Sequence, residues 1–144
     1  MILVADLLKH KGSQVWSLDT SATVRDALKL LAEKDIGSLL VMEGDRVAGV
    51  FSERYFAREQ AEKDTLLLDM PVSNLMSRPV HCISPADNIE QCMQLMTEQH
   101  IRHLPVLQEE KLVGLISIGD VVKQLISHQK SFIRQLEDYI GGRW

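Results

Sequence analysis

The amino-acid sequence contains the same unit twice, and this duplication constrains the fold more than any other feature. When the chain is aligned with itself at an offset of 65 residues, residues 24–52 coincide with residues 89–117 without a gap. The matching pairs include Val24 with Ile89, Leu30 with Leu95, Ile36 with Ile101, Leu39 with Leu104, Gly49 with Gly114 and Ser52 with Ser117. A long unit that occurs twice indicates a pair of related modules, because a solenoid stacks three or more copies of a shorter unit.

The similarity continues upstream of these blocks at a slightly different offset. Residues 4–8, VADLL, match residues 72–76, VSNLM, at an offset of 68 residues. The three extra residues fall in KHKGSQ, which we expect to be a polar loop. We therefore divide the chain into repeat 1, residues 1–66, and repeat 2, residues 67–144, which includes a long C-terminal helix.

Hydrophobic periodicity predicts the same order of elements in both repeats: strand, helix, strand, strand, helix. In SATVRDALKLLAEKDIG the apolar residues recur at helical spacing, with Ser21 or Thr23 as the N-cap and Gly37 at the end of the helix. Two short apolar runs follow, joined by EGD in repeat 1 and by EEK in repeat 2, as in a hairpin. A helix between two strands favours a parallel crossover, so we expect an α+β fold of two β-α-β-β-α repeats with mixed sheets.

Composition excludes several classes of protein. The chain has 144 residues, of which 45% are hydrophobic and 25% charged, which is typical of a globular domain. A net charge of −4 argues against nucleic-acid binding, which relies on clustered Lys and Arg. The opening apolar run is too short to cross a membrane and has no signal-segment pattern, so we expect a cytoplasmic protein that does not bind membranes.

The stretch GLISIGD, residues 114–120, has the residue types of an anion site. Ser117 ends a predicted strand where the next helix begins, so its hydroxyl and the helix N-terminus could both bind a phosphate, and Gly119 would let the backbone approach closely. Asp120, one helical turn further on, could accept two hydrogen bonds from a ribose diol. The alternative is a capping box, in which Ser117 and Asp120 only stabilise the start of the helix.

The corresponding stretch in repeat 1, GVFSERY, keeps Ser52 but has Tyr55 in place of the aspartate. A phenol cannot offer two acceptor oxygens to a ribose, so a ribose site there is doubtful. Arg54 could still donate charge-assisted hydrogen bonds to a phosphate, including one bound at the other repeat's site. The alternative is that Arg54 is an ordinary solvated arginine.

These features together resemble a tandem pair of cystathionine-β-synthase (CBS) domains, also called a Bateman module. The resemblance rests on the duplication, on IRHLPV, and on hairpins that close with Gly, two apolar residues and Ser. It implies a pseudo-two-fold pair with packed sheets, clefts that bind adenosine-containing ligands, and a disc-shaped homodimer. The ligand-binding residues that it implies are Ser117, Asp120, Gly119, Ile116, Ile101, Arg102, His103, Pro105, His81, Val80, Ser52 and Arg54.

The resemblance implies a regulatory module that binds an adenosine nucleotide and changes its shape or its contacts with an unidentified partner protein. AMP is the first candidate ligand, and ATP, ADP, NAD(H) and S-adenosylmethionine are the others. No enzyme motif is present, and Ser117 has no evident general base beside it, so we expect no catalysis. The alternative is a structural or protein-interaction dimer whose clefts are vestigial.

The histidines and cysteines have simpler interpretations. His100 and His103 are three residues apart across a predicted helix end and lack the tight Cys/His cluster of a zinc site, so we expect no bound metal. Cys92 lies on an apolar helix face and Cys82 on the predicted first strand of repeat 2. We expect both thiols to be core residues.

The C-terminal segment has an apolar stripe at helical spacing. It comprises Val122, Leu125, Ile126, Ile133, Leu136 and Ile140, widened by Phe132 and Tyr139, before GGRW ends the helix at Gly141. Such a stripe could pack on its own domain. A helix of about twenty residues exceeds what one small sheet can cover, which favours a partner subunit and a homodimer.

Overall fold

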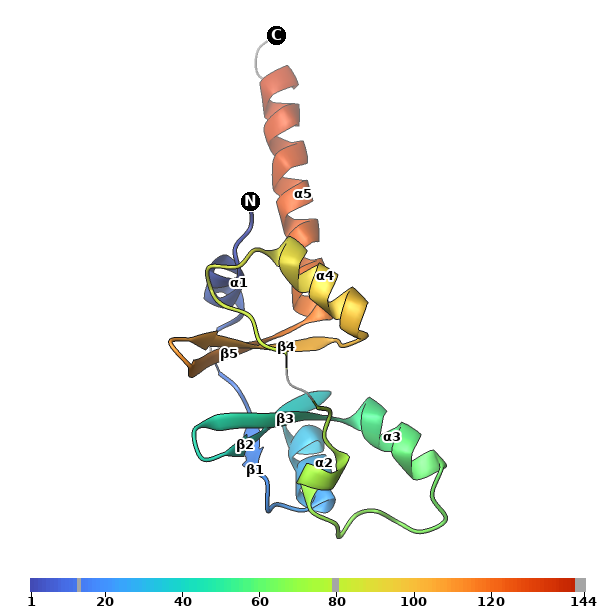
Figure 1. Cartoon of the computed structure of the whole chain (residues 1–144). Coiled ribbons are helices and arrows are strands. Elements are labelled where there is room, and N and C mark those ends of the chain that lie inside the picture. Colours follow the sequence, from blue (N-terminus) through green and yellow to red (C-terminus); the bar gives the residue numbers. More distant parts are fainter. Residues whose placement is uncertain (13, 79–80, 142–144) are drawn as a thin grey trace.

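Two small sheets lie at the centre of the molecule, with most of the helices on their outer sides (Figure 1). The computed structural model describes residues 1–12, 14–78 and 81–141. One sheet has the order β1 (Ser17–Asp19), β2 (Ser38–Glu43), β3 (Arg46–Ser52), with β1 parallel and β3 antiparallel to β2. The other pairs β4 (His103–Gln108) with β5 (Lys111–Ser117) in antiparallel fashion. The predicted mixed architecture is confirmed.

The two helices that the sequence predicts in each repeat begin where it places them. Repeat 1 contains α2 (Val24–Lys34) and α3 (Glu53–Ala61), and repeat 2 contains α4 (Ile89–Gln99) and α5 (Ile118–Gly141). Of the two proposed N-caps of α2, Thr23 is the one used, and its hydroxyl accepts a hydrogen bond from the Asp26 amide at 3.1 Å. The side chain of Asn88 caps α4 in the same way. Polar caps at equivalent positions therefore fix both helix starts.

The predicted end of α2 at Gly37 is wrong. The helix ends at Lys34, and Asp35 takes the left-handed conformation with φ of 53°. Its counterpart in repeat 2, His100, does the same with φ of 55°. Both copies thus terminate this helix with a left-handed residue that is not glycine, a conformation that short polar side chains tolerate best.

The predicted first strand of repeat 2 is also wrong. It is reduced to a parallel bridge between Ile83 and Val106, and Cys82 is exposed rather than part of the core. Successive side chains of an extended segment point to opposite sides, so the burial of Ile83 turns Cys82 outward. Cys92 on α4 is fully buried, as predicted, and burial raises its thiol pKa to about 11.

Each repeat completes its core with the segment that precedes the other repeat. The first helix, α1 (Val4–Lys11), buries Val4 and Leu7 in the core of repeat 2. The short 3₁₀ helix η1 (Val72–Leu75) buries Val72 and Leu75 in the core of repeat 1. Figure 1 shows α1 beside α4 and α5, and η1 beside α2. The matching residues VADLL and VSNLM therefore each complete the hydrophobic core of the other repeat.

Backbone hydrogen bonds repeat the exchange on both sides. The Val4 amide donates to the Asp87 carbonyl at 2.8 Å, and the equivalent Val72 amide donates to the Ala22 carbonyl at 2.7 Å. The Ile89 amide donates to the Ile2 carbonyl at 3.0 Å, and a bond of the same length joins Val24 to Met70. The exchange therefore follows the internal pseudo-two-fold relation of the chain.

The three extra residues of repeat 1 do not form the predicted loop. Lys9, His10 and Lys11 continue α1 by most of a turn, with Gly12 as its C-cap. Their basic side chains lie at the C-terminal end of the helix, where its dipole favours positive charge. The insertion therefore lengthens a helix and carries Lys11 across the face of repeat 2.

Two equivalent glycines allow the exchanged segments to approach closely. A Cβ atom at Gly114 on β5 would lie 2.6 Å from Leu8 Cδ2, and one at Gly49 on β3 would lie 2.4 Å from Met76 Sδ and 3.0 Å from Met76 Cβ. The backbone approach is tighter at Gly49, because Met76 cannot avoid the contact by turning its end away.

We predict that Gly49→Ala destabilises the chain by about 1–3 kcal/mol, since overpacking forces side chains off their preferred rotamers. Gly114→Ala should cost less, because the end of Leu8 is flexible. Urea unfolding measures both. Gly37→Ala is the matched control, since its Cβ atom would meet Glu53 Oε1 at an ordinary 3.8 Å. Equal stability of Gly49→Ala and the control would contradict the close packing.

Candidate functional site

A cleft of about 810 Å³ lies between the two repeats. Its walls come from the β3–α3 junction of repeat 1, from the segment between α4 and β4 of repeat 2, and from Ser77 and His81 in the connection. Two equivalent pairs line it together, Gly37 with Arg102 and Glu53 with Ile118. The cleft therefore reaches the pseudo-two-fold axis and is built by both halves.

Three arginines face this cleft. Arg54 and Arg58 come from α3, and Arg102 comes from the turn before β4. Their mutual repulsion is shown by Arg54, whose pKa is lowered by the nearby charges of Arg102 and Arg58. No ion pair joins any of the three to a carboxylate within residues 1–12, 14–78 and 81–141. The cleft thus holds a concentration of positive charge that an anion would relieve.

The start of α3 lies at the same cleft. The Ser52 hydroxyl caps the helix by accepting a hydrogen bond from the Tyr55 amide at 3.1 Å. The N-terminus of a helix carries a partial positive charge, which adds to that of the arginines. Tyr55 lines the cleft and also packs against the core of repeat 1, so its ring is a half-buried wall.

Most of the residues singled out in the sequence meet in this cleft, and a second group does not. The cleft contains Ser52, Arg54, His81, Ile101, Arg102, His103 and Pro105. Ser117, Gly119 and Asp120 lie outside its lining, at the start of α5. Ile116 is fully buried in the core of repeat 2 and has no surface to offer a ligand. Val80 lies outside the described residues.

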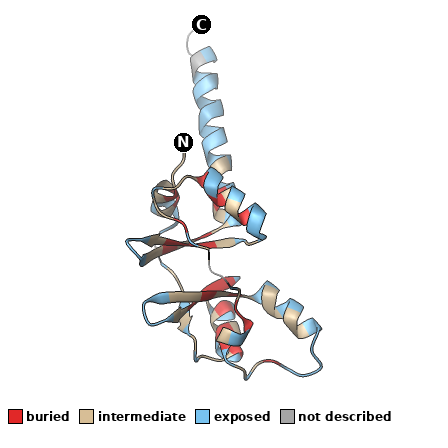
Figure 2. Cartoon of the chain, viewed as in Figure 1, coloured by how far each residue is buried: buried red, intermediate tan, exposed pale blue. Residues whose placement is uncertain are grey.

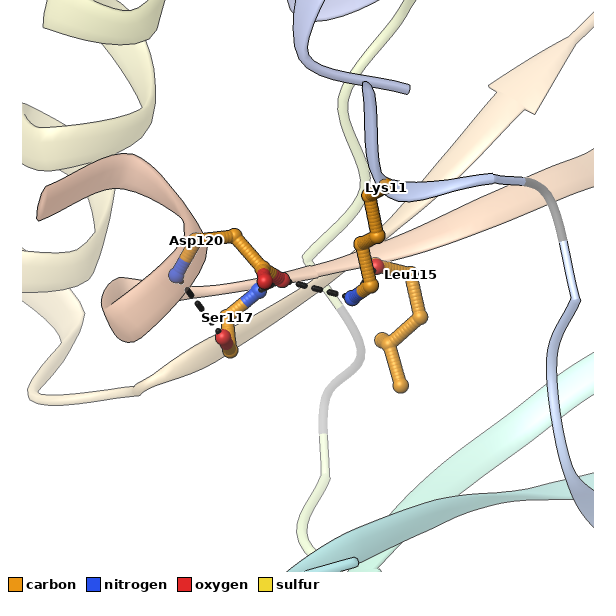
Figure 3. Close-up of polar contacts among 4 residues, drawn as sticks. All are labelled: Lys11, Leu115, Ser117 and Asp120. Carbon is orange, nitrogen blue, oxygen red and sulfur yellow. Dashed lines mark hydrogen bonds and ion pairs between the residues drawn. The ribbon is translucent and has the colours of Figure 1, made fainter. Parts of the chain in front are cut away.

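Ser117 and Asp120 form a capping box at the start of α5 (Figure 3). The Asp120 amide donates to the Ser117 hydroxyl at 3.1 Å, and the Ser117 amide donates to Asp120 Oδ2 at 2.8 Å. The capping alternative is therefore observed in the structure. It does not exclude ligand binding, which stays a prediction at these residues.

Lys11 of α1 also reaches this carboxylate. Its ammonium group lies 2.5 Å from Asp120 Oδ2 and also donates to the Leu115 carbonyl (Figure 3). Burial raises the pKa of Asp120, but hydrogen bonds from Lys11 and Ser117 outweigh it and hold the pKa below its ordinary value of 3.8. The predicted ribose-binding group is thus already engaged by a lysine from the N-terminal helix.

His103 lies between the two groups of residues. It lines the cleft and pairs with Ser117 across the β4–β5 ladder. Its pKa is lowered, first by burial and then by the charges of Lys11 and Arg102, while Asp120 opposes the shift. At neutral pH the imidazole is therefore uncharged and can act as a hydrogen-bond donor or acceptor.

Sequence reasoning missed Lys11 and Arg58. Lys11 is separated from Asp120 by 109 positions, so no local pattern links the two residues. The only hint in the sequence was the three-residue insertion that contains Lys11. Arg58 lies one turn after Arg54 on α3, so helical spacing could have placed it on the same face. Within the part of the chain that the structure describes, no group of three or more His, Cys, Asp or Glu side chains is arranged to hold a metal ion.

We predict that Lys11→Met raises the pKa of Asp120 and destabilises the chain at neutral pH by about 0.5–1 kcal/mol, a small effect because both side chains remain partly exposed. The folded pKa lies below the unfolded one, so the ionised carboxylate stabilises the fold above the unfolded pKa. This contribution is lost as the pH falls through the folded pKa.

Carboxyl NMR titration and unfolding at several pH values measure both effects. The matched control is Arg25→Met, which removes the exposed ion pair with Asp69. An unchanged Asp120 pKa in Lys11→Met would show that the contact does not form in solution.

The CBS domain family model matches residues 4–62 and 72–127 of this chain. The chain is 30% identical over 149 residues to the mitochondrial CBS domain-containing protein CBSX3 of Arabidopsis thaliana, covering 96% of this chain and 72% of that protein. It also matches 13% of an A-adding tRNA nucleotidyltransferase of Geobacter sulfurreducens, at 28% identity over 84% of this chain.

Solved structures give the same result. A protein of Burkholderia ambifaria, described as a signal-transduction protein with CBS domains, is 42% identical, with a TM-score of 0.82 over 88% of this chain and 96% of that one. The CBS domain pair of protein MJ0100, solved with 5′-methylthioadenosine and S-adenosylmethionine, is 18% identical, with a TM-score of 0.75 over 90% of this chain and 98% of that one. At that identity the likeness concerns the fold alone.

Proposed function

Because the chain belongs to the CBS domain family and carries the domain twice, we propose that it is a regulatory module that binds an adenosine nucleotide in the cleft between its repeats. The observation that carries this proposal is the group of Arg54, Arg58 and Arg102, which have no carboxylate partner in the described ranges. Phosphate oxygens are the acceptors that suit guanidinium groups best, since they can take paired hydrogen bonds.

The rest of the cleft suits a nucleoside. Ile101 and Pro105 provide apolar walls for a flat base, and Tyr55 adds an aromatic surface. His103, uncharged at neutral pH, can exchange a hydrogen bond with a base or a sugar. The apolar walls and the arginines would thus bind opposite ends of one ligand, which is the usual composition of a small-molecule site.

The positive charge also bears on which ligand binds. Three guanidinium groups favour several phosphates, so ATP and ADP suit the cleft better than AMP, the first candidate from the sequence. NAD(H) has two phosphates like ADP, but they are esterified at both ends and carry less negative charge, so it suits the arginines less well than ADP. S-adenosylmethionine carries a sulfonium cation and no phosphate, and the arginines would repel it. The adenosine ligands of the MJ0100 pair support the nucleoside part of the proposal only.

We predict that affinity rises from AMP to ADP to ATP, and that Arg102→Ala weakens ATP binding by roughly tenfold or more while affecting AMP less. Calorimetric titration measures this series. Arg25→Ala on α2 is the control, because Arg25 pairs with Asp69 and does not line the cleft. Equal affinity for AMP and ATP in the unmodified chain would overturn the role of the arginines.

A second site at Ser117 and Asp120 remains part of the proposal. A ribose there must share Asp120 with Lys11 or displace it, because both would use the same carboxylate. The sequence predicts that this site of repeat 2 binds the nucleotide more tightly than the site of repeat 1. Asp120→Ala should then weaken nucleotide binding roughly ten- to a hundredfold. If the residue only caps α5, the variant should have a lower melting temperature without ligand and unchanged affinity.

We propose further that the chain acts without catalysis, as a homodimer in the cytoplasm. CBS pair proteins are generally regulatory, and among the described residues the cleft serines Ser52 and Ser77 make their hydrogen bonds to the backbone and not to a histidine or a carboxylate. Turnover of ATP by the pure chain, lost in Ser117→Ala, would contradict this. Within the described residues no helix is both long enough and apolar enough to span a bilayer. The alternative function, an interaction dimer with vestigial clefts, predicts no ligand binding.

A further inference from the structure

The second half of α5 extends away from the rest of the molecule. Figure 2 shows it as an exposed rod beyond the packed helices. Val121 is buried and Leu125 half-buried, but every residue from Ile126 to Asp138, and Ile140, is exposed. An isolated helix of this length is marginal in water, so a partner surface is needed to keep it ordered.

This exposed part has a large apolar surface. Its members are 46% to 56% exposed: Val122, Ile126, Phe132, Ile133, Leu136 and Ile140. The side chain of Tyr139 lies outside the described residues. Large apolar side chains gathered on one side of an otherwise polar helix mark a contact surface.

The spacing of this surface is that of a coiled coil. Val122, Ile126, Gln129, Ile133, Leu136 and Ile140 are successively four, three, four, three and four residues apart. Spacings that alternate between three and four place all six on one seam. The series is the same in both directions, so it is symmetric about Ser131.

We propose that a second copy of this chain packs antiparallel along α5, with the two helices related by a two-fold axis near Ser131. In this register Val122 faces Ile140 of the second copy, Ile126 faces its Leu136, and Gln129 faces its Ile133. Each seam residue then meets another seam residue. The one polar member of the seam, Gln129, faces an apolar residue in this register, so we infer the register from the symmetric spacing and from the charges beside the seam.

Charge selects this orientation over the parallel one. Lys123 and Glu137 lie on the same flank of the seam, 14 residues apart, which is about 21 Å along the helix. In the antiparallel pair, Lys123 of each copy lies opposite Glu137 of the other, giving two attractive contacts. Lys130, midway between them on the same flank, lies opposite Lys130 of the other copy, so the two attractive contacts outnumber one repulsive contact. In a parallel pair these residues stay about 21 Å apart and cannot meet.

The two bodies would then lie at opposite ends of the helix pair, and not side by side as in the disc that the resemblance implies. The proposal goes beyond ligand binding and does not depend on it. It gives the proposed homodimer a defined contact surface on α5. The nucleotide proposal concerns the cleft, to which α5 contributes Ile118 and no later residue.

The test is sedimentation equilibrium of the full chain and of charge-reversal variants. Lys123→Glu and Glu137→Lys should each weaken dimerisation roughly tenfold, because each creates two repulsive contacts, and the double variant should restore it. Asp138→Lys is the matched control, since it makes the same charge change one residue further on, on the outward side of the helix. It should leave the dimer unchanged.

Ile133→Asp should give a monomer whose body melts normally, because Ile133 is 52% exposed and is not among the residues packed against either core. A wild-type monomer across the micromolar range would overturn the proposal, and so would a double variant as weak as its parents. The thermal shift with ATP is measured for every variant. Its retention in a monomer separates failure of the helix pairing from failure of nucleotide binding.

Discussion

The contact between each exchanged segment and a glycine of the opposite sheet is what the rest of the molecule depends on. Leu8 of α1 lies against Gly114, and Met76, directly after η1, lies against Gly49. Each segment brings apolar side chains that the local repeat does not supply. Burying one such side chain contributes about 1.5–3 kcal/mol, so Val4 and Leu7 matter for a core of this size. Because the exchange is reciprocal, it also fixes the two sheets relative to each other and gives the cleft between them defined walls.

The same fold therefore presents two chemically different sides. Where repeat 1 begins α3, the cleft contains arginines from both repeats and a tyrosine wall. Where repeat 2 begins α5, a carboxylate is paired with a lysine. Burial and then the charges of both Lys11 and Arg102 lower the pKa of His103, so its protonation depends on both sites. The two copies share most of their elements, and a few differences in residue type give them different electrostatics.

Much of the fold follows from local sequence patterns, whereas the contacts between distant residues do not. Periodicity predicted both hairpins and the starts of the helices, because side-chain spacing and caps act within a few residues. It could not show that VADLL packs on the other repeat, or that Lys11 reaches Asp120. The sequence predicts Arg54 and Arg102 as separate candidate residues, but it does not predict that they lie together. Only the packing of the two repeats brings them together with Arg58.

The exchange of segments also imposes an order on folding. Repeat 1 has all of its core once the chain has been synthesised to Met76. The core of repeat 2 needs Val4 and Leu7 to meet residues as distant as Val121. Contacts of such high sequence separation form slowly, because the long intervening loop must close first. During synthesis on the ribosome, repeat 1 can therefore fold while the apolar face of α1 is still exposed to solvent. That face becomes buried only when repeat 2 has been synthesised.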